Sequence, residues 1–360
     1  MSFSFGFEDD DDIESTDTSK QNAPVPKNTK STQNEGQSTS APEIARSHKI
    51  EDLLSSLPSK IAYSFVEIES PKGRKVKLPR RELFDIRLQL MAEDDGDENE
   101  QVSLDESDIR TNVYEGGYKS WECSFDLAKL LLDRGPRKDL DDLCRVDHVV
   151  ELGCGTSIPS LILFHYAITE GLGIYFTLTD YNASVLRLVT LPNLLLTWAS
   201  TLPATDTPFS PESPNPLKEA HDNGDLEITP ELVEAFLSAL RGQGITINLI
   251  SGSWSPSRPF LSLIPTAPEM NILCLASETI YSPAALVSFT EALIGILKQV
   301  RMGKGIVAAK KMYFGVGGSV DAFKIECRER QAVAYEIENH NIDLGQHGGV
   351  RRSLVEVQML

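Results

Sequence analysis

The sequence predicts an α/β protein whose core is a mostly parallel sheet, and three observations support this class. From Asn112 onward, short apolar runs typical of strands alternate with longer runs typical of helices. The stretch "VVELGCGTSIPSLILF", Val149–Phe164, has the order of a buried strand, a tight glycine turn and an apolar helix. The chain ends on two alternating segments joined by a glycine-containing loop, which favours a final antiparallel hairpin.

The individual elements follow from these patterns in chain order. Seven strands are expected, at His148–Leu152, Ile174–Thr179, Thr246–Ile250, Asn271–Ala276, Gly305–Ala309, Gln331–Glu338 and Arg352–Met359. The expected helices are Trp121–Asp133, Ser157–Ala167, Ala183–Trp198, Pro230–Leu240 and Pro283–Val300. The helix at Pro230 has a clear start, because Thr229 can cap it and proline suits the first helical position. Seven strands in this alternation match a class I, Rossmann-like methyltransferase sheet.

The first third of the chain has a different composition. Residues 1–45 are rich in Ser, Thr, Asn, Asp and Pro, so we expect a disordered acidic tail. Residues 46–111 are predicted to be an N-terminal extension, which ends in an acidic connector at residues 93–108 with nine acids and no base. The methyltransferase domain is expected at residues 112–360. Within it, the polar stretch 201–227 is predicted to be a surface insertion.

The extension itself shows modest patterns. A short helix is expected around Ile50–Leu57, and "KIAYSFVEI" and "ELFDIRLQLM", residues 60–68 and 82–91, alternate like strands. Between them "KGRKVKLPRR", Lys72–Arg81, has six basic residues in ten. It is interpreted as a solvated hairpin tip or, alternatively, a nuclear localisation patch.

Composition excludes several classes of protein. The chain of 360 residues has a formal net charge of −19, so a phosphate backbone would be repelled and no direct nucleic-acid partner is expected. No apolar run approaches the length of a membrane span, and the acidic N-terminus lacks the basic start of a signal peptide. The five cysteines are scattered and form no C-x-x-C, which argues against disulfides and a metal site. We expect a metal-free monomer located in the cytoplasm and the nucleus.

Three ligands compete for the glycine turn. A P-loop would need a lysine after the glycines, and none follows. A dinucleotide turn would need a small residue where Ile158 stands. S-adenosyl-L-methionine has no pyrophosphate and carries a cationic sulfonium and an ammonium, so Glu151 at the strand end would favour its binding. Gly153 and Gly155 are therefore predicted to hold S-adenosyl-L-methionine.

The next strands supply further candidate contacts. "YFTLTDYN" places Asp180 at the end of the second strand, where a carboxylate can accept hydrogen bonds from ribose hydroxyls. The alternative is that Asp180 and Asn182 only cap the following helix. In "ISGSWS" a strand ends in a turn at Gly252, and Trp254 could cover an adenine or belong to the core.

Six motifs in this order resemble the protein-histidine methyltransferases that modify a large-subunit ribosomal protein. They are "EGGYKSWECSFDLAKLL", "VVELGCGTSIPSL", "LTDYNASVL", "ISGSWS", "ASETIYSP" and "MYFGVGGSV". The resemblance implies a seven-strand enzyme that methylates a histidine, at the tele nitrogen, with a basic ribosomal protein as its partner. It also implies cofactor contacts at Ser120, Trp121, Glu122, Cys123, Ser124, Gly153, Asp180, Tyr181, Asn182, Gly252, Ser253, Trp254 and Ser277.

The acid-x-x-Tyr motif at Glu278–Tyr281 is the candidate catalytic element. A neutral imidazole already offers a lone pair at cellular pH, so the enzyme needs a group that holds the other ring N–H. Glu278 and Tyr281 follow the fourth strand and are predicted to do this. The alternative is that Glu278 only caps the next helix or forms a local ion pair.

Two other functions fit the same residues. A lysine methyltransferase of the same branch shares the acid-x-x-Tyr motif, and an assembly factor that binds a nascent ribosomal protein could methylate it secondarily. The acidic block at residues 93–108 is expected either to steer a basic substrate or to serve as a solvated spacer.

Overall fold

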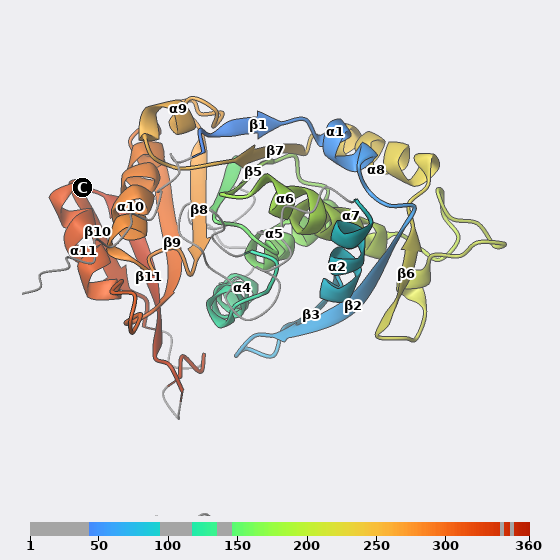
Figure 1. Ribbon diagram of the computed structural model, residues 1–360, viewed down its shortest axis with the longest axis horizontal. Coiled ribbons are helices and arrows are strands. Elements are labelled where there is room, and N and C mark those ends of the chain that lie inside the picture. The colour runs from blue at the N-terminus through green and yellow to red at the C-terminus, as the bar shows by residue number, and fades with distance from the viewer. Residues whose placement is uncertain (1–42, 94–116, 135–145, 339–341, 346–348) are drawn as a thin grey trace, which may run out of the picture. The chain divides into compact units, whose positions relative to one another are not determined.

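The computed structural model describes residues 43–93, 117–134, 146–338, 342–345 and 349–360 (Figure 1). These described residues form one unit. The predicted disordered tail lies outside the described residues up to residue 42, as does the acidic connector beyond Glu93. Cys144 also lies outside them.

An eight-stranded sheet organises the protein, in the order β1-β7-β5-β4-β8-β9-β11-β10. The seven expected strands are all present, and the class I α/β fold is confirmed. Their bounds are β4 His148–Leu152, β5 Tyr175–Asp180, β7 Thr246–Ser251, β8 Asn271–Ser277, β9 Met302–Lys310, β10 Ala332–Glu336 and β11 Arg352–Met359. Strands β7, β5, β4, β8 and β9 run parallel, whereas β11 and β10 form the expected antiparallel hairpin.

The eighth strand was not expected from the sequence. Strand β1, Arg46–His48, pairs antiparallel with β7 at the edge of the sheet, with Arg46 opposite Ser251. Three residues carry too little pattern to be recognised alone, so this strand depends on the free edge of β7. It joins the N-terminal extension to the main sheet.

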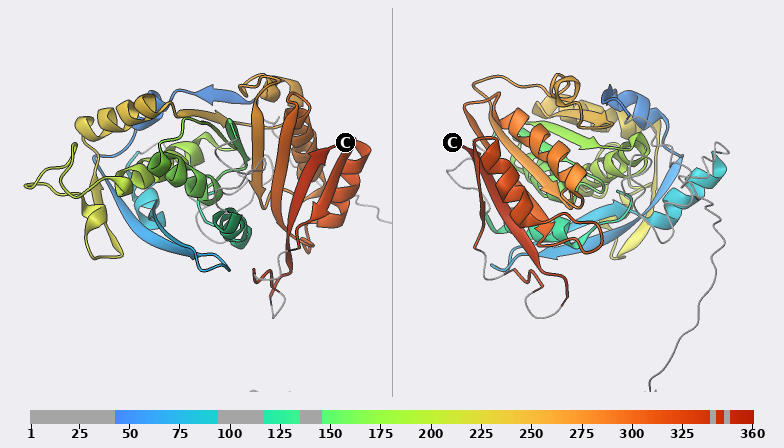
Figure 2. Two further views of the ribbon diagram at one scale, coloured as in Figure 1. Left: turned by 180° about the vertical axis from the view of Figure 1, so that it is seen from behind. Right: turned by 60° about the vertical axis from the view of Figure 1, so that its left-hand side comes forward.

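Helices cover both faces of the sheet (Figures 1 and 2). One face packs against α4 Glu122–Arg134, α5 Ile158–Glu170, α7 Leu191–Thr201 and α8 Pro230–Gln243. The other packs against α9 Ser257–Leu261, α10 Pro283–Leu297 and α11 Val320–Glu329. Neighbouring strand residues divide between the faces: Val149 belongs to the first core and Val150 to the second. Helix α11 was not expected from the sequence.

A second sheet, of three antiparallel strands, has the order β3-β2-β6. Strand β2 is Lys60–Glu69, β3 is Lys75–Arg81 and β6 is Asn223–Glu227. The predicted hairpin tip at Lys72–Arg81 is therefore mostly strand, and its lysines form ion pairs with neighbouring acids. The predicted surface insertion contributes β6 and the short 3-10 helix η2, Pro216–Lys218.

The prediction of a strand at residues 82–91 was wrong. Leu83–Ala92 is helix α2, because Ile86 and Leu90, four residues apart, are its buried positions. Over so short a run, the pattern of apolar and polar residues is compatible both with the two-residue period of a strand and with the 3.6-residue period of a helix. The preceding helix α1, Ile50–Ser55, was expected.

The expected helix at 183–198 is present but interrupted. It begins as α6, Ala183–Val185, widens into a π-turn at Leu186–Thr190 (η1) and continues as α7. Pro192 has no N–H to donate to the carbonyl of Leu188, four residues earlier. The buried Arg81 guanidinium donates to that carbonyl instead, at 3.1 Å. This contact ties the second sheet to the helix beside the cavity described below.

No helix within the described part of the chain is both long and apolar enough to cross a membrane.

Candidate active site

A cavity opens at the carboxyl ends of the parallel strands, where the sheet order reverses between β4 and β8. Most of the residues predicted from the sequence line it. These are Trp121, Ser124, Gly153, Gly155, Asp180, Tyr181, Gly252, Ser253, Trp254, Ser277, Glu278 and Tyr281. The sequence missed further lining residues, among them Gly117, Lys119 and Thr279.

The glycine turn leaves no room for side chains. Gly153 and Gly155 have φ angles of 68° and 49°. A Cβ on Gly153 would lie 2.9 Å from the Thr279 methyl carbon, and one on Gly155 would lie 3.1 Å from the Gly117 carbonyl oxygen. Glycine is therefore required both for backbone conformation and for the close approach of these segments. A bound molecule can reach the backbone here.

Asp180 joins the second strand to the glycine turn. Its carboxylate accepts hydrogen bonds from the backbone N–H groups of Gly155, at 3.0 Å, and Asn182, at 3.1 Å. The side chain of Asn182 makes no cap bond at the start of α6, so that part of the capping alternative is not observed. Asp180 lines the cavity, and a carboxylate has lone pairs left for further donors.

The last residues of the segment predicted to be a disordered tail support the wall at Gly252. The Ser253 N–H donates to the Glu43 carbonyl at 2.8 Å. A Cβ on Gly252, whose φ is 106°, would lie 2.8 Å from the Cα of Ala45. The neighbouring Trp254 lines the cavity and also packs edge-on against Phe289, so the cofactor and core interpretations of this indole are both compatible with its position.

Four predicted contacts lie just behind the wall or away from it. Ser120 accepts a hydrogen bond from Arg80 at 3.2 Å and contacts Thr156, a lining residue, at 2.9 Å. Glu122 is exposed in the first turn of α4. Cys123 is fully buried, and Asn182 is buried behind Asp180. Ser120 and Cys123 therefore act on the cavity only through the residues in front of them.

Glu151 does not lie on the cavity wall. Its side chain is fully buried on the helix side of β4 and accepts a hydrogen bond from the N–H of Ser160 at 3.2 Å, in the first turn of α5. Burial raises the pKa of Glu151 to about 8, which favours the neutral form of the group. The prediction that its charge attracts a sulfonium is not supported, because alternate residues of a strand face opposite sides.

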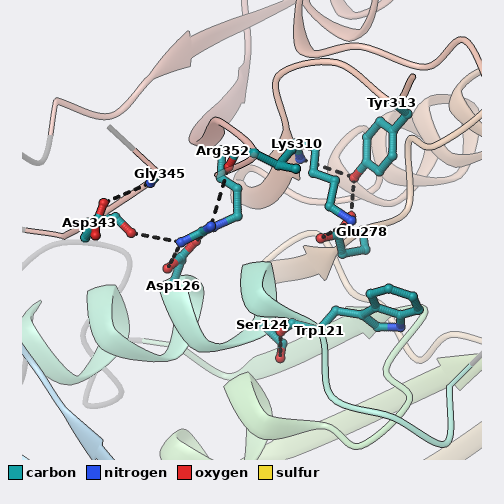
Figure 3. Close-up of polar contacts among 10 residues, drawn as sticks. Trp121, Ser124, Asp126, Glu278, Lys310, Tyr313, Asp343, Gly345 and Arg352 are labelled. Carbon is teal, nitrogen blue, oxygen red and sulfur yellow. Dashed lines mark hydrogen bonds and ion pairs between the residues drawn. The ribbon is translucent and has the colours of Figure 1, made fainter. Parts of the chain in front are cut away.

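Glu278 follows β8 directly and has an unusual backbone for a glutamate, with φ at 58°. Its carboxylate accepts a hydrogen bond from the Tyr313 hydroxyl at 2.6 Å (Figure 3). The other oxygen, Oε1, lies 3.6 Å from the ammonium of Lys310 and has no hydrogen-bond partner among the described residues, although the side chain is only 9% exposed. A buried carboxylate oxygen without a donor is costly to maintain, so it is available for one.

The groups around Glu278 are held in protonated form. Burial and the nearby Glu278 charge raise the pKa of the Tyr313 hydroxyl and that of the Cys123 thiol. Tyr313 therefore donates to Glu278 and does not compete with it for protons. Sequence reasoning missed Tyr313 and Lys310 as site residues, although Tyr313 lies in the motif "MYFGVGGSV".

Tyr281, the second predicted catalytic residue, lines the cavity three residues after Glu278. Its backbone carbonyl accepts a hydrogen bond from the Gly318 N–H at 3.0 Å. A Cβ on Gly318 would lie 1.9 Å from the Ile280 carbonyl oxygen, so the loop that carries Tyr313 packs directly against the acid-x-x-Tyr segment. The two motifs form one corner of the cavity.

The residues present suit S-adenosyl-L-methionine. Asp180 offers a carboxylate to hydroxyl donors, and the glycine turn allows backbone approach, since any Cβ would fill it. The aromatic Trp254 and Tyr181 stand on the same wall. Glu278, Trp121 and Ser124 of the α4 start also line the cavity. The lining thus offers groups suited to a nucleoside together with the carboxylate of Glu278.

Comparison with known proteins gives a consistent result. No protein-family model matches the chain. The chain is 37% identical to histidine protein methyltransferase 1 of Saccharomyces cerevisiae over 381 aligned positions. This alignment covers 99% of this chain and 98% of that protein. It is 35% identical to the Schizosaccharomyces pombe protein of the same name, over 79% of this chain and 77% of that one. The Bos taurus homolog is 28% identical over 70% of this chain and 57% of its own length.

Among solved structures, a putative class I S-adenosylmethionine-dependent methyltransferase from Listeria monocytogenes is 11% identical with a TM-score of 0.35. The alignment covers 77% of this chain and 68% of that one.

Proposed function

Since this chain belongs to the histidine protein methyltransferase 1 family and is an S-adenosyl-L-methionine-dependent protein-histidine methyltransferase, we propose that it methylates a histidine of a basic large-subunit ribosomal protein. We propose further that Glu278 orients the target imidazole. The methyl group goes to the tele nitrogen, and Glu278 accepts the N–H of the other ring nitrogen.

Bound S-adenosyl-L-methionine supplies an activated methyl group on a positively charged sulfur. The chain has to place the nucleophile behind that methyl group and keep water away. The tele nitrogen of the neutral imidazole would take this methyl group, so that an N–CH₃ bond would replace the S–CH₃ bond and sulfur would keep the electron pair. A positive charge then spreads over the ring. Glu278 stabilises that charge and takes the hydrogen bond of the remaining N–H.

The single observation that carries this role is the unsatisfied Oε1 of Glu278. Tyr313 occupies Oε2, and Lys310 is too far from Oε1 for a hydrogen bond, at 3.6 Å. The cavity wall therefore presents one buried carboxylate oxygen that needs a donor. The ring N–H of a neutral histidine is such a donor, and accepting it fixes the tautomer with its lone pair on the attacking nitrogen.

The choice of a ribosomal substrate rests on charge and on the resemblance described above. The chain has a formal net charge of −19, whereas proteins that coat RNA are basic. Opposite charges speed the encounter of the two proteins, and this effect weakens with salt.

The experiment combines two measurements. Purified enzyme and labelled cofactor are added to ribosomal proteins and, separately, to the remaining soluble proteins of cells that lack the enzyme, and mass spectrometry maps the modified peptide. Methylhistidine in a large-subunit protein supports the substrate proposal; methylhistidine only in the other fraction rejects it. Glu278→Gln should lower kcat at least tenfold while the cofactor Kd stays within about threefold, and an unchanged kcat would reject the role of Glu278.

A further inference from the structure

Four segments of the chain bring charged or titratable groups together around Glu278. Glu278 comes from the end of β8, Lys310 from the end of β9, Tyr313 from the loop after β9 and Cys123 from α4. Farther along α4, Asp126 is bound to Arg352 of β11 at 2.5 Å, so those two charges compensate each other. Lys119 is a further base on the cavity wall.

Lys310 brings an ammonium group into this cluster. Its ammonium lies 3.6 Å from Glu278 Oε1, 5.1 Å from the centre of the Trp121 ring and 5.7 Å from that of Tyr313 (Figure 3). Both rings attract a cation toward their faces. The side chain is 21% exposed, so solvent only partly screens its charge. Trp121 and Glu278 line the cavity, and the Lys310 ammonium is near both of them.

We propose that Lys310 determines acceptor specificity: it compensates the Glu278 charge so that the site accepts a neutral imidazole and rejects a cationic side chain. This inference rests on the proposed function, because it presumes that Glu278 faces the acceptor. A lysine ammonium or a protonated histidine would enter beside a carboxylate that is already paired and would be repelled by Lys310. A neutral imidazole needs only one acceptor and is not repelled.

The consequence concerns the lysine methyltransferase alternative left open by the sequence. The acid-x-x-Tyr motif alone cannot separate the two reactions, since a carboxylate can hold either an imidazole N–H or an ammonium. With Lys310 in place, the Glu278 carboxylate can still accept a hydrogen bond from a defined direction, but the pair carries little net negative charge. Lys310 acts through Glu278 and is therefore a positioning residue.

The test measures peptide binding to the full-length enzyme in the presence of S-adenosylhomocysteine, so that no methyl transfer occurs. One peptide carries the mapped histidine and a second has lysine at that position. For the wild type, the histidine-peptide Kd should rise about tenfold from pH 8 to pH 5.5 as the imidazole becomes protonated. In Lys310→Met this ratio should fall below threefold, and the lysine peptide should bind at least tenfold more tightly than to the wild type.

Three variants act as controls. Lys311→Met removes the neighbouring lysine, which is half exposed and paired with Glu336 at 2.9 Å, and should keep the wild-type values. Lys310→Arg keeps a positive charge at this position and should also keep the wild-type binding constants. If Lys310→Met does not fold, Lys310→Gln is measured in its place.

The proposal is overturned if the neutral variant binds the lysine peptide no better than the wild type, or if Lys310→Arg loses discrimination to the same extent as Lys310→Met. Failure of the proposed function is detected separately. It would appear as an unchanged kcat in Glu278→Gln or as a different mapped protein, and neither result depends on these binding constants.

Discussion

Replacing Tyr313 by phenylalanine tests whether the hydroxyl that holds Glu278 matters for methyl transfer. The substitution removes one hydrogen bond of 2.6 Å to a carboxylate and leaves the ring in place. A hydrogen bond to a charged group contributes about 1.5–3 kcal/mol. If that energy serves to hold Glu278 in its reactive orientation, kcat should fall by roughly 10- to 100-fold. Tyr313 does not line the cavity, so the cofactor Kd should stay within about twofold.

The assay is a single-turnover measurement of labelled methyl transfer at saturating cofactor, with calorimetry of cofactor binding and a thermal melt on the same samples. Tyr335→Phe is the matched control, because its hydroxyl also bonds a glutamate, Glu356, at 2.5 Å, but on the hairpin at the far edge of the sheet. Tyr335→Phe should have a lower melting temperature than the wild type and an unchanged kcat. A Tyr313→Phe enzyme within twofold of the wild-type kcat, or an equal loss in Tyr335→Phe, would refute the reasoning.

Three further outcomes are expected. Gly153→Arg should abolish cofactor binding by calorimetry while the protein remains folded by circular dichroism, because even a Cβ there would lie 2.9 Å from Thr279; an unchanged affinity would contradict the placement of the turn. Asp180→Ala should raise the cofactor Kd about 100-fold, since about 3 kcal/mol of charged hydrogen bonding is lost; a change in melting temperature alone would instead favour a purely structural role. For Glu151, burial raises the pKa to about 8 from an ordinary 4.5, so its contribution to folding is complete below pH 4.5 and is lost as pH rises toward 8. Glu151→Gln does not titrate, so in urea unfolding it should gain stability relative to the wild type between pH 5 and pH 8; a constant difference would mean that Glu151 is not buried as a neutral acid.

Much of the cavity could be predicted because its residues are local. The glycine turn, Asp180 and Glu278 each follow directly on an apolar strand, and parallel strands place their carboxyl ends at one edge of the sheet. The prediction that Glu151 contacts the cofactor was not supported, and the reason lies in the same strand pattern. It is one residue too early, so the alternation of the strand directs it under α5 and away from the edge.

The residues that could not be predicted depend on register. Glu278 and Lys310 are 32 residues apart in the sequence and meet because β8 and β9 pair with Ser277 opposite Ala308. A shift of one residue in that pairing would turn the lysine to the other face of the sheet. Strand β1 and helix α2 likewise took their form from the surfaces available to them, namely the edge of β7 and the core that receives Ile86 and Leu90.

The sequence by itself therefore determined the α/β class, seven strands of the main sheet, the glycine turn and the acids at the strand ends, because apolar periodicity and glycine conformation act over a few residues. Only the tertiary structure decided which groups surround Glu278. The hydroxyl of Tyr313 and the ammonium of Lys310 come from the end of β9 and the loop after it, and sheet pairing brings them to the end of β8. An electrostatic environment is a sum over groups distant in the chain, and no local pattern encodes it.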